Sequence, residues 1–70
     1  MNKPLYIIET NKETGKQYLW ATSMKDRAAT EEGMNIVYPI NQFPRTRGTF
    51  EVVNEIPTPC WLAGNGKQIR

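Results

Sequence analysis

The most informative part of the chain is residues 4–22, which read PLYIIETNKETGKQYLWAT. The segments 5–8 and 18–21 are both rich in the β-branched and aromatic residues that favour strands. Polar residues 11–16 separate them, with Gly15 near the end, where a hairpin loop needs a left-handed residue and glycine meets no clash. We therefore expect a β-hairpin over residues 4–22.

A short helix is expected directly after the hairpin, over about residues 24–32. Residues 23–26 match a helix-start pattern, with Ser23 as the N-cap and the Asp26 carboxylate near the positive helix end. Gly33 favours a C-terminal stop. A helix this short is not stable alone, so it must pack on the sheet. The positions expected to face inward are Met24, Ala28 and Ala29.

Two further strands are expected after the helix. Residues 35–40 (NIVYPI) predict an edge strand, because Pro39 has no N–H to donate to a neighbouring strand. Residues 41–48 predict a loop, since they are polar and contain Pro44 and Gly48. Residues 49–56 alternate between apolar and polar side chains. One face of that strand would carry Phe50, Val52 and Ile56, and the other would carry Glu51 and Glu55.

The order of these elements predicts an α+β fold. It is a single small domain, β-β-α-β-β, with a mostly antiparallel sheet and one short helix packed on one face. Seventy residues leave no room for a second core. Residues 1–56 would form the core domain. Residues 57–70 would be a Pro/Gly-rich C-terminal extension that Trp61 anchors.

The composition removes several classes of protein. The chain has no histidine and a single cysteine, so histidine catalysis and an intramolecular disulfide are both excluded. The N-terminal residues Met1–Pro4 are followed by no apolar leader segment, because Glu9 and Thr10 interrupt at once, and no run of 18 apolar residues exists. We expect a cytoplasmic protein without a membrane partner.

The residues that usually carry chemistry offer no convincing site. Ser23 already has a structural role as the expected cap, and Cys60 has no base beside it, which favours a buried, inert thiol. Glu51 and Glu55 would lie about 13 Å apart along a strand, too far to share a metal ion. Residues 64–67 (GNGK) lack the following hydroxyl of a phosphate-binding loop. We expect no enzyme, no metal and no cofactor.

The charge is unevenly distributed. The net charge is +2, and residues 41–70 carry all of it, because four basic groups there face two acidic ones. The basic groups are Arg45, Arg47, Lys67 and Arg70. Such an excess permits an anionic partner in the C-terminal half.

A protein-binding module is the leading functional hypothesis. Aromatic and arginine side chains are enriched at interface hot spots, and the chain carries several beyond its expected helix. The candidate contact residues lie in loop 42–48 and near the C-terminus: Phe43, Arg45, Arg47, Trp61, Lys67 and Arg70. The expected edge strand at Pro39 would also be open to a partner or to a second copy of the chain. The alternative is that Phe43 and Trp61 merely close the two ends of the core.

A small module that binds single-stranded nucleic acid is the alternative function. Tyr6, Tyr18 and Trp20 would share one sheet face if Tyr6 pairs near Trp20, and exposed sheet aromatics can stack bases. Arg45 and Arg47 would add phosphate contacts. The stronger interpretation is that a domain this small needs the same aromatics for its core.

The first half of the chain resembles small accessory proteins of phages and mobile elements, including anti-CRISPR-like inhibitors of host complexes. The resemblance covers residues 4–34 and is carried by Tyr6-Ile7-Ile8-Glu9, Gly15, Trp20-Ala21 and Ser23-Met24-Lys25-Asp26. It implies a protein that acts stoichiometrically by occupying a surface of a host protein or nucleoprotein complex. It transfers no functional residue to this chain.

Overall fold

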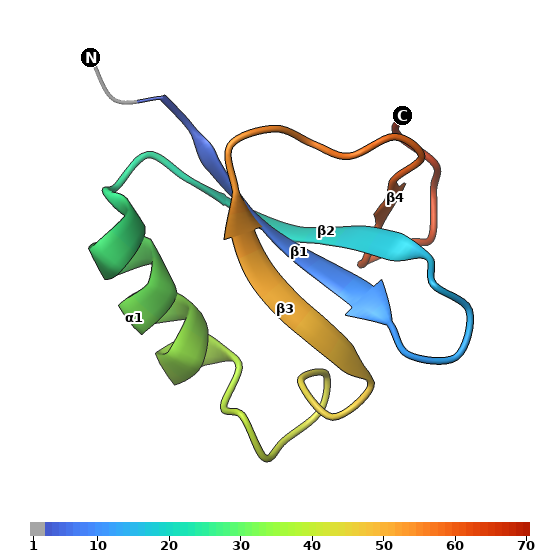
Figure 1. Cartoon of the computed structure of the whole chain (residues 1–70), viewed down its shortest axis with the longest axis horizontal. Coiled ribbons are helices and arrows are strands. Elements are labelled where there is room, and N and C mark those ends of the chain that lie inside the picture. Colours follow the sequence, from blue (N-terminus) through green and yellow to red (C-terminus); the bar gives the residue numbers. More distant parts are fainter. Residues whose placement is uncertain (1–2) are drawn as a thin grey trace.

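A computed structural model of the chain describes residues 3–70, so the parts of the leader and domain predictions that concern Met1 and Asn2 lie outside the described residues. The elements follow the order β-β-α-β-β (Figure 1). They are β1 (Leu5–Asn11), β2 (Gln17–Ser23), α1 (Arg27–Val37), β3 (Gly48–Val53) and β4 (Trp61–Leu62). The expected α+β class is confirmed, with one helix and one four-stranded sheet.

The expected hairpin is confirmed as β1 and β2. Its loop is closed by the Asn11 N–H, which donates to the Lys16 carbonyl at 2.9 Å, and by the Gly15 N–H, which donates to the Asn11 carbonyl at 2.9 Å. Gly15 has a φ of 76°, the left-handed conformation for which the sequence provides a glycine. The Asn11 side chain accepts from the N–H groups of Glu13 and Thr14, which fixes the turn further.

The sheet is mixed, with the strand order β3-β1-β2-β4. Strand β1 lies antiparallel to both β2 and β3, whereas β4 runs parallel to β2 and pairs only with Tyr18 and Leu19. Residues 54–60 connect the two opposite edges of the sheet (Figure 1). The C-terminal extension therefore contributes a strand to the sheet, and Trp61 lies beside Tyr18 with their ring centroids 6.3 Å apart.

The helix starts later than the sequence predicted. It spans Arg27–Val37, and its N-cap is Asp26, whose Oδ1 accepts from the Ala29 N–H at 2.8 Å. The predicted cap, Ser23, ends β2, where its hydroxyl accepts from the Lys25 N–H and bonds the Thr30 hydroxyl at 2.8 Å. Asp26 is the better cap because its side chain reaches a free N–H three residues on.

The strand predicted at residues 35–40 is wrong. Residues up to Val37 continue α1, so Gly33 lies inside the helix rather than ending it, and Pro39 follows in a turn. The predicted inward face is wrong at two of its three positions, since Met24 and Ala28 are exposed, whereas Ala29 is half-buried. The buried positions of α1 are Thr30 and Met34, one helical turn apart.

The core lies between α1 and one face of the sheet. Leu5, Ile7 and Val52 face the helix and pack with Met34. The last predicted strand is confirmed as β3 but ends at Val53, so Ile56 lies outside it. Because β1 side chains alternate between faces, Glu9 falls on the same face as Ile7, and this position determines the site described next.

Candidate functional site

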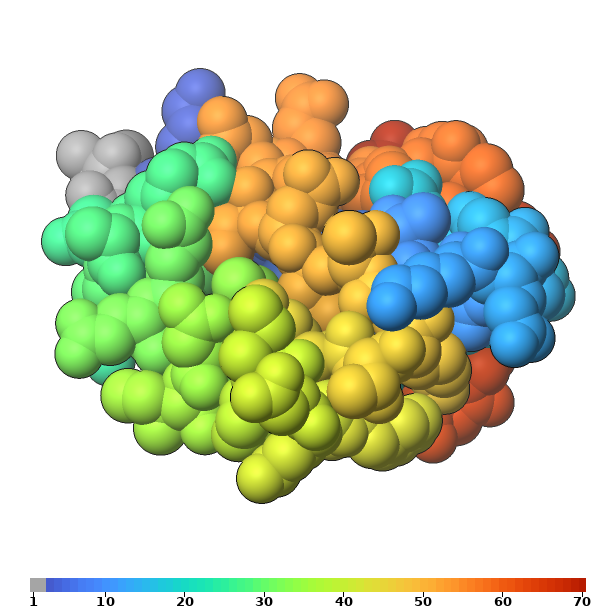
Figure 2. All heavy atoms as spheres, turned by 60° about the horizontal axis from the view of Figure 1, so that its bottom comes forward, coloured from blue at the N-terminus to red at the C-terminus, as the bar shows by residue number. Residues whose placement is uncertain are grey.

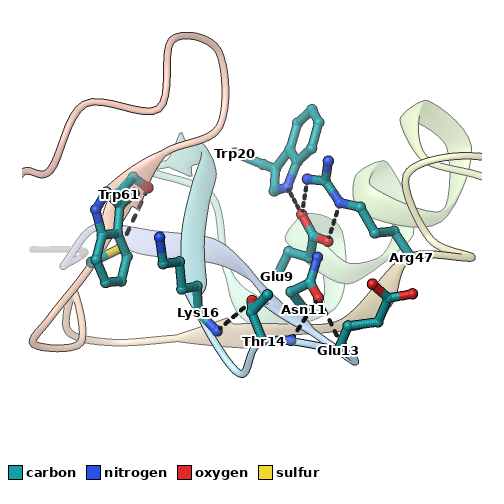
Figure 3. Close-up of polar contacts among 9 residues, drawn as sticks. Glu9, Asn11, Glu13, Thr14, Lys16, Trp20, Arg47 and Trp61 are labelled. Atoms are coloured by element: carbon teal, nitrogen blue, oxygen red, sulfur yellow. Dashed lines mark hydrogen bonds and ion pairs between the residues drawn. The ribbon is translucent and has the colours of Figure 1, made fainter.

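Glu9 is a fully buried carboxylate in the middle of the sheet. Three donors hold it: Trp20 donates from Nε1 to Oε1 at 2.8 Å, and Arg47 donates from Nε to Oε2 at 2.8 Å and from Nη2 to Oε1 at 2.7 Å. Figure 3 shows the indole and the guanidinium converging on the carboxylate from different segments of the chain. The bidentate geometry is the strongest form of this ion pair, and it fastens the loop before β3 to the centre of the sheet.

The protonation of this pair follows from its contacts. Burial alone would raise the pKa of Glu9, but the hydrogen bonds from Arg47 and Trp20 and the charge of Arg47 outweigh it and lower that pKa. The hydrogen bond with Glu9 likewise raises the pKa of Arg47. Both groups are therefore charged at neutral pH, and the pair is a structural brace.

A β-bulge aims Trp20 at Glu9. Ile7 pairs with Ala21 and Ile8 pairs with Leu19, which leaves Trp20 as the additional residue in β2. A bulge re-aims a side chain in this manner, and here it turns the indole N–H toward the buried carboxylate.

Aromatic side chains surround the brace. Trp20, Tyr38 and Phe50 form a mutual cluster, with ring centroids 5.4–6.0 Å apart. The Arg45 guanidinium lies over Phe50 at 5.3 Å and donates to the Tyr38 carbonyl. These rings pack on one another and against arginines, as core aromatics do.

The predicted stacking face is wrong in one respect. Tyr6 pairs with Thr22 and Val53, whereas Tyr18 pairs with Glu9. Because Tyr6 and Glu9 are an odd number of residues apart on β1, the side chains of Tyr6 and Tyr18 project from opposite faces of the sheet.

The six predicted contact residues fall into two groups. Phe43, Arg45 and Arg47 lie together in the loop between α1 and β3, with the Arg47 guanidinium 5.2 Å from the Phe43 ring centroid. Trp61, Lys67 and Arg70 lie in the C-terminal segment, where Trp61 carries the Lys16 ammonium over its ring at 4.9 Å. Both arginines of the first group are engaged inside the chain, and Phe43 is the member that remains 67% exposed.

Four large apolar side chains project from the end of α1 and the loop after it. They are Ile36, Val37, Ile40 and Phe43, each between 65% and 71% exposed, and we call them the apolar patch. They lie within residues 33–44, twelve consecutive residues without a charge. In Figure 2 the light green and yellow-green atoms of this part of the chain cover the lower left and the bottom of the face shown.

Sequence reasoning found only Phe43 of this patch. Ile36, Val37 and Ile40 fell in the predicted edge strand and were not among the predicted contact residues. The signal that would have found Ile36 is the helical phase: if Thr30 and Met34 face the core, then residue 36 faces away. Val37 lies three residues after Met34 and on the same side of the helix, so the phase alone does not predict its exposure.

The remaining candidates for chemistry are separate from one another. Cys60 is buried, and burial raises the pKa of its thiol. Within residues 3–70, no three His, Cys, Asp or Glu side chains lie close enough to hold a metal ion. No helix of this described part has the length and apolar character needed to cross a membrane.

Comparison with known proteins gave no match to a family model, a curated protein or a solved structure.

Proposed function

We propose that this chain is a non-enzymatic protein-binding module that acts stoichiometrically, by occupying a surface of a larger complex through the apolar patch. The observation that carries the proposal is the exposure of Ile36, Val37, Ile40 and Phe43 within eight residues of one another. Apolar side chains that are exposed together in one segment of a soluble protein are typical of interaction sites, whereas isolated exposed apolar residues are not.

The composition of the patch also fits an interface. The centres of protein interfaces are depleted in charge, and residues 33–44 carry none. Asn35, Asn41 and Gln42 are exposed among the apolar residues and would supply the polar rim. Aromatic side chains dominate binding energy at such surfaces, which makes Phe43 the expected anchor.

The patch is held in place before any partner arrives. Arg47 fastens the loop to Glu9, and Arg45 ties it to Asn35 and to the Tyr38 carbonyl. A surface that is already ordered loses less conformational entropy on binding. In this proposal the main role of Arg45 and Arg47 is to hold the loop that carries Phe43, and any direct contact of theirs with the partner contributes less to binding.

The resemblance of residues 4–34 to phage and mobile-element accessory proteins suggests the class of partner. It favours a host protein or nucleoprotein complex whose function the chain inhibits or redirects. An apolar patch suits a protein surface better than a phosphate backbone, because phosphates are bound by free cations and the loop arginines already have acceptors inside the chain. Single-strand binding is the second candidate, and a separate titration with a labelled strand tests it.

The experiment is a comparison of immobilised variants in a host lysate, followed by identification of the captured proteins. Ile36→Gln with Ile40→Gln removes half of the patch without changing the charge. Glu51→Gln with Thr58→Gln changes two exposed residues elsewhere and serves as the control. We expect a defined protein that the wild type and the control capture and that the patch variant loses. Thermal unfolding of each variant checks that the fold is intact.

Two results would contradict the proposal. Equal capture by the patch variant would show that the patch is not the contact. Tight binding of a short labelled single strand at low salt, with no captured protein, would favour the nucleic-acid function.

A further inference from the structure

A groove runs between β2 and α1, on the opposite side of the helix from β3. Its volume is about 440 Å³, within the range of sites that bind small molecules or peptide side chains. Ala21, Met34 and Val37 contribute apolar walls, and Gly33 leaves the helix side open because it has no side chain. The groove arises because α1 packs over β1 and β3 while β2 lies further along the sheet.

The strand beside this groove has a free edge. Strand β4 covers β2 only at Tyr18 and Leu19, so residues 20–23 have no strand on the side away from β1 in the described chain. Thr22 lines the groove although its side chain lies on the opposite sheet face from Ala21 and Ser23, so the groove reaches the strand edge itself. An unpaired edge of this kind presents backbone N–H and C=O groups that another chain can pair with.

The charge of the groove is also one-sided. Among the lining residues in the described part of the chain, 3–70, Lys25 is the single charged one. The neighbouring carboxylate, Asp26, caps the helix through Oδ1. Within residues 3–70, Lys25 forms no ion pair of its own, since the salt bridge found there joins Arg47 to Glu9. The groove therefore offers an ammonium group beside an apolar hollow and a strand edge.

We propose that residues 20–23 of β2 accept an extended segment of a partner protein as an added strand, with an apolar side chain in the groove and an acidic one near Lys25. Main-chain hydrogen bonds would supply affinity, and the groove and Lys25 would supply selectivity. A second copy of this chain fits less well. Of its own residues 20–23, Trp20 is held against Glu9, and Ala21 and Ser23 are too small to fill the groove. None of the four brings a carboxylate for Lys25.

The probe is a blocked peptide of alternating valine and glutamate, titrated into the isotope-labelled full chain. We expect NMR shift changes at the backbone amides of residues 21–23 and slowed hydrogen exchange at those of residues 20–23 whose N–H groups point away from β1, with shift changes at Met34. A matched peptide of alternating valine and lysine should bind about tenfold more weakly. Equal binding of both peptides, no binding, or shifts confined to other residues would overturn the proposal.

Variants of the groove separate its two contributions. A Cβ at Gly33 would meet no atom within 4 Å, so Gly33→Leu should fill the groove without disturbing the fold, and Gly33→Ala is its control. We expect Gly33→Leu to abolish binding and Gly33→Ala to retain it. Lys25→Gln should weaken the glutamate peptide about threefold, the size of one exposed ion pair, and strengthen the lysine peptide by about the same factor, because it removes the repulsion. Unchanged binding in both Gly33→Leu and Lys25→Gln would overturn the proposal.

The groove and the apolar patch are tested independently. Ile36 and Ile40 do not line the groove, so Ile36→Gln with Ile40→Gln should bind the peptide as the wild type does. Failure of the patch experiment thus leaves the groove proposal standing, and the reverse also holds. Sedimentation could instead show a stable dimer whose residues 21–23 are protected from hydrogen exchange without any peptide. That result would overturn the proposal and make a second copy of the chain the occupant of the strand edge.

Discussion

At Gly48 the fold leaves no space for a side chain. It opens β3 opposite Asn11, and a Cβ there would come 2.9 Å from the Thr10 carbonyl carbon and 3.0 Å from Oε2 of Glu9. Since backbone atoms cannot move aside cheaply, we expect Gly48→Ala to lower the free energy of unfolding by about 3 kcal/mol. Urea denaturation measures this. Gly64→Ala is the control, because a Cβ there meets nothing within 4 Å and its change should stay within about 0.5 kcal/mol.

Arg47 and Glu9 depend on each other because only one of them reaches solvent. The Arg47 side chain is 37% exposed, whereas the Glu9 side chain is fully buried. Arg47→Ala would leave a buried carboxylate without its counter-ion, and we expect a loss of about 3 kcal/mol, at the low end for buried pairs because Arg47 is partly exposed.

A double-mutant cycle in urea tests this coupling. In the Glu9→Gln background no buried charge remains, so Arg47→Ala should cost much less there. Equal costs in both backgrounds would contradict a coupled brace. The same coupling means that Arg45→Ala with Arg47→Ala perturbs folding as well as any interface, which is why the patch variants are the better test of function.

At the scale of elements, the hairpin was predictable from the sequence and the start of the helix was not. The hairpin depends on contacts within residues 4–22, so its composition and Gly15 were sufficient. Ser23 and Asp26 are both good caps by composition, and what decided between them was tertiary: Ser23 is held at the end of β2 by its bond to Thr30.

Asp26, and not the predicted Ser23, should therefore stabilise α1 as its N-cap. Asp26→Ala removes the acceptor for the Ala29 N–H, and we expect a loss of about 1 kcal/mol in the free energy of unfolding. Asp26→Asn keeps an acceptor oxygen at that position and should cost only a few tenths of that. Chemical denaturation monitored by circular dichroism distinguishes them, and equal losses in both variants would place the cap elsewhere.

At the scale of the whole molecule, the order β-β-α-β-β agrees with the prediction, although only one of the two strands predicted after the helix is among the two observed there. Residues 35–40 form helix and turn rather than a strand, and the fourth strand is β4, which is two residues long and gains its pairing only from Tyr18 and Leu19. Neither could be read locally, because NIVYPI has strand composition and β4 is defined by a partner 43 residues away. The site was recognised in part: Phe43, Arg45 and Arg47 share one loop, but the role of Glu9 required knowing that it faces the core.

The buried carboxylate also makes the stability of the whole domain depend on pH. Folding lowers the pKa of Glu9 below the ordinary glutamate value of about 4.3, because its bonds to Arg47 and Trp20 outweigh burial. Above that ordinary value Glu9 is ionised in both states and the stabilisation is complete. As the pH falls below it, the unfolded chain takes up a proton first, and the stabilisation is lost progressively until the folded carboxyl is protonated as well.

The free energy of unfolding should therefore fall with acid in this window. The Glu9→Gln variant should be less stable than the wild type at pH 7, and the difference should shrink as the pH falls. Urea titrations from pH 7 down to about pH 3 measure the gap, with Glu13→Gln as an exposed control that should follow the wild-type curve. A gap between wild type and Glu9→Gln that stayed constant across this range would mean that the carboxylate charge does not hold the loop to the sheet.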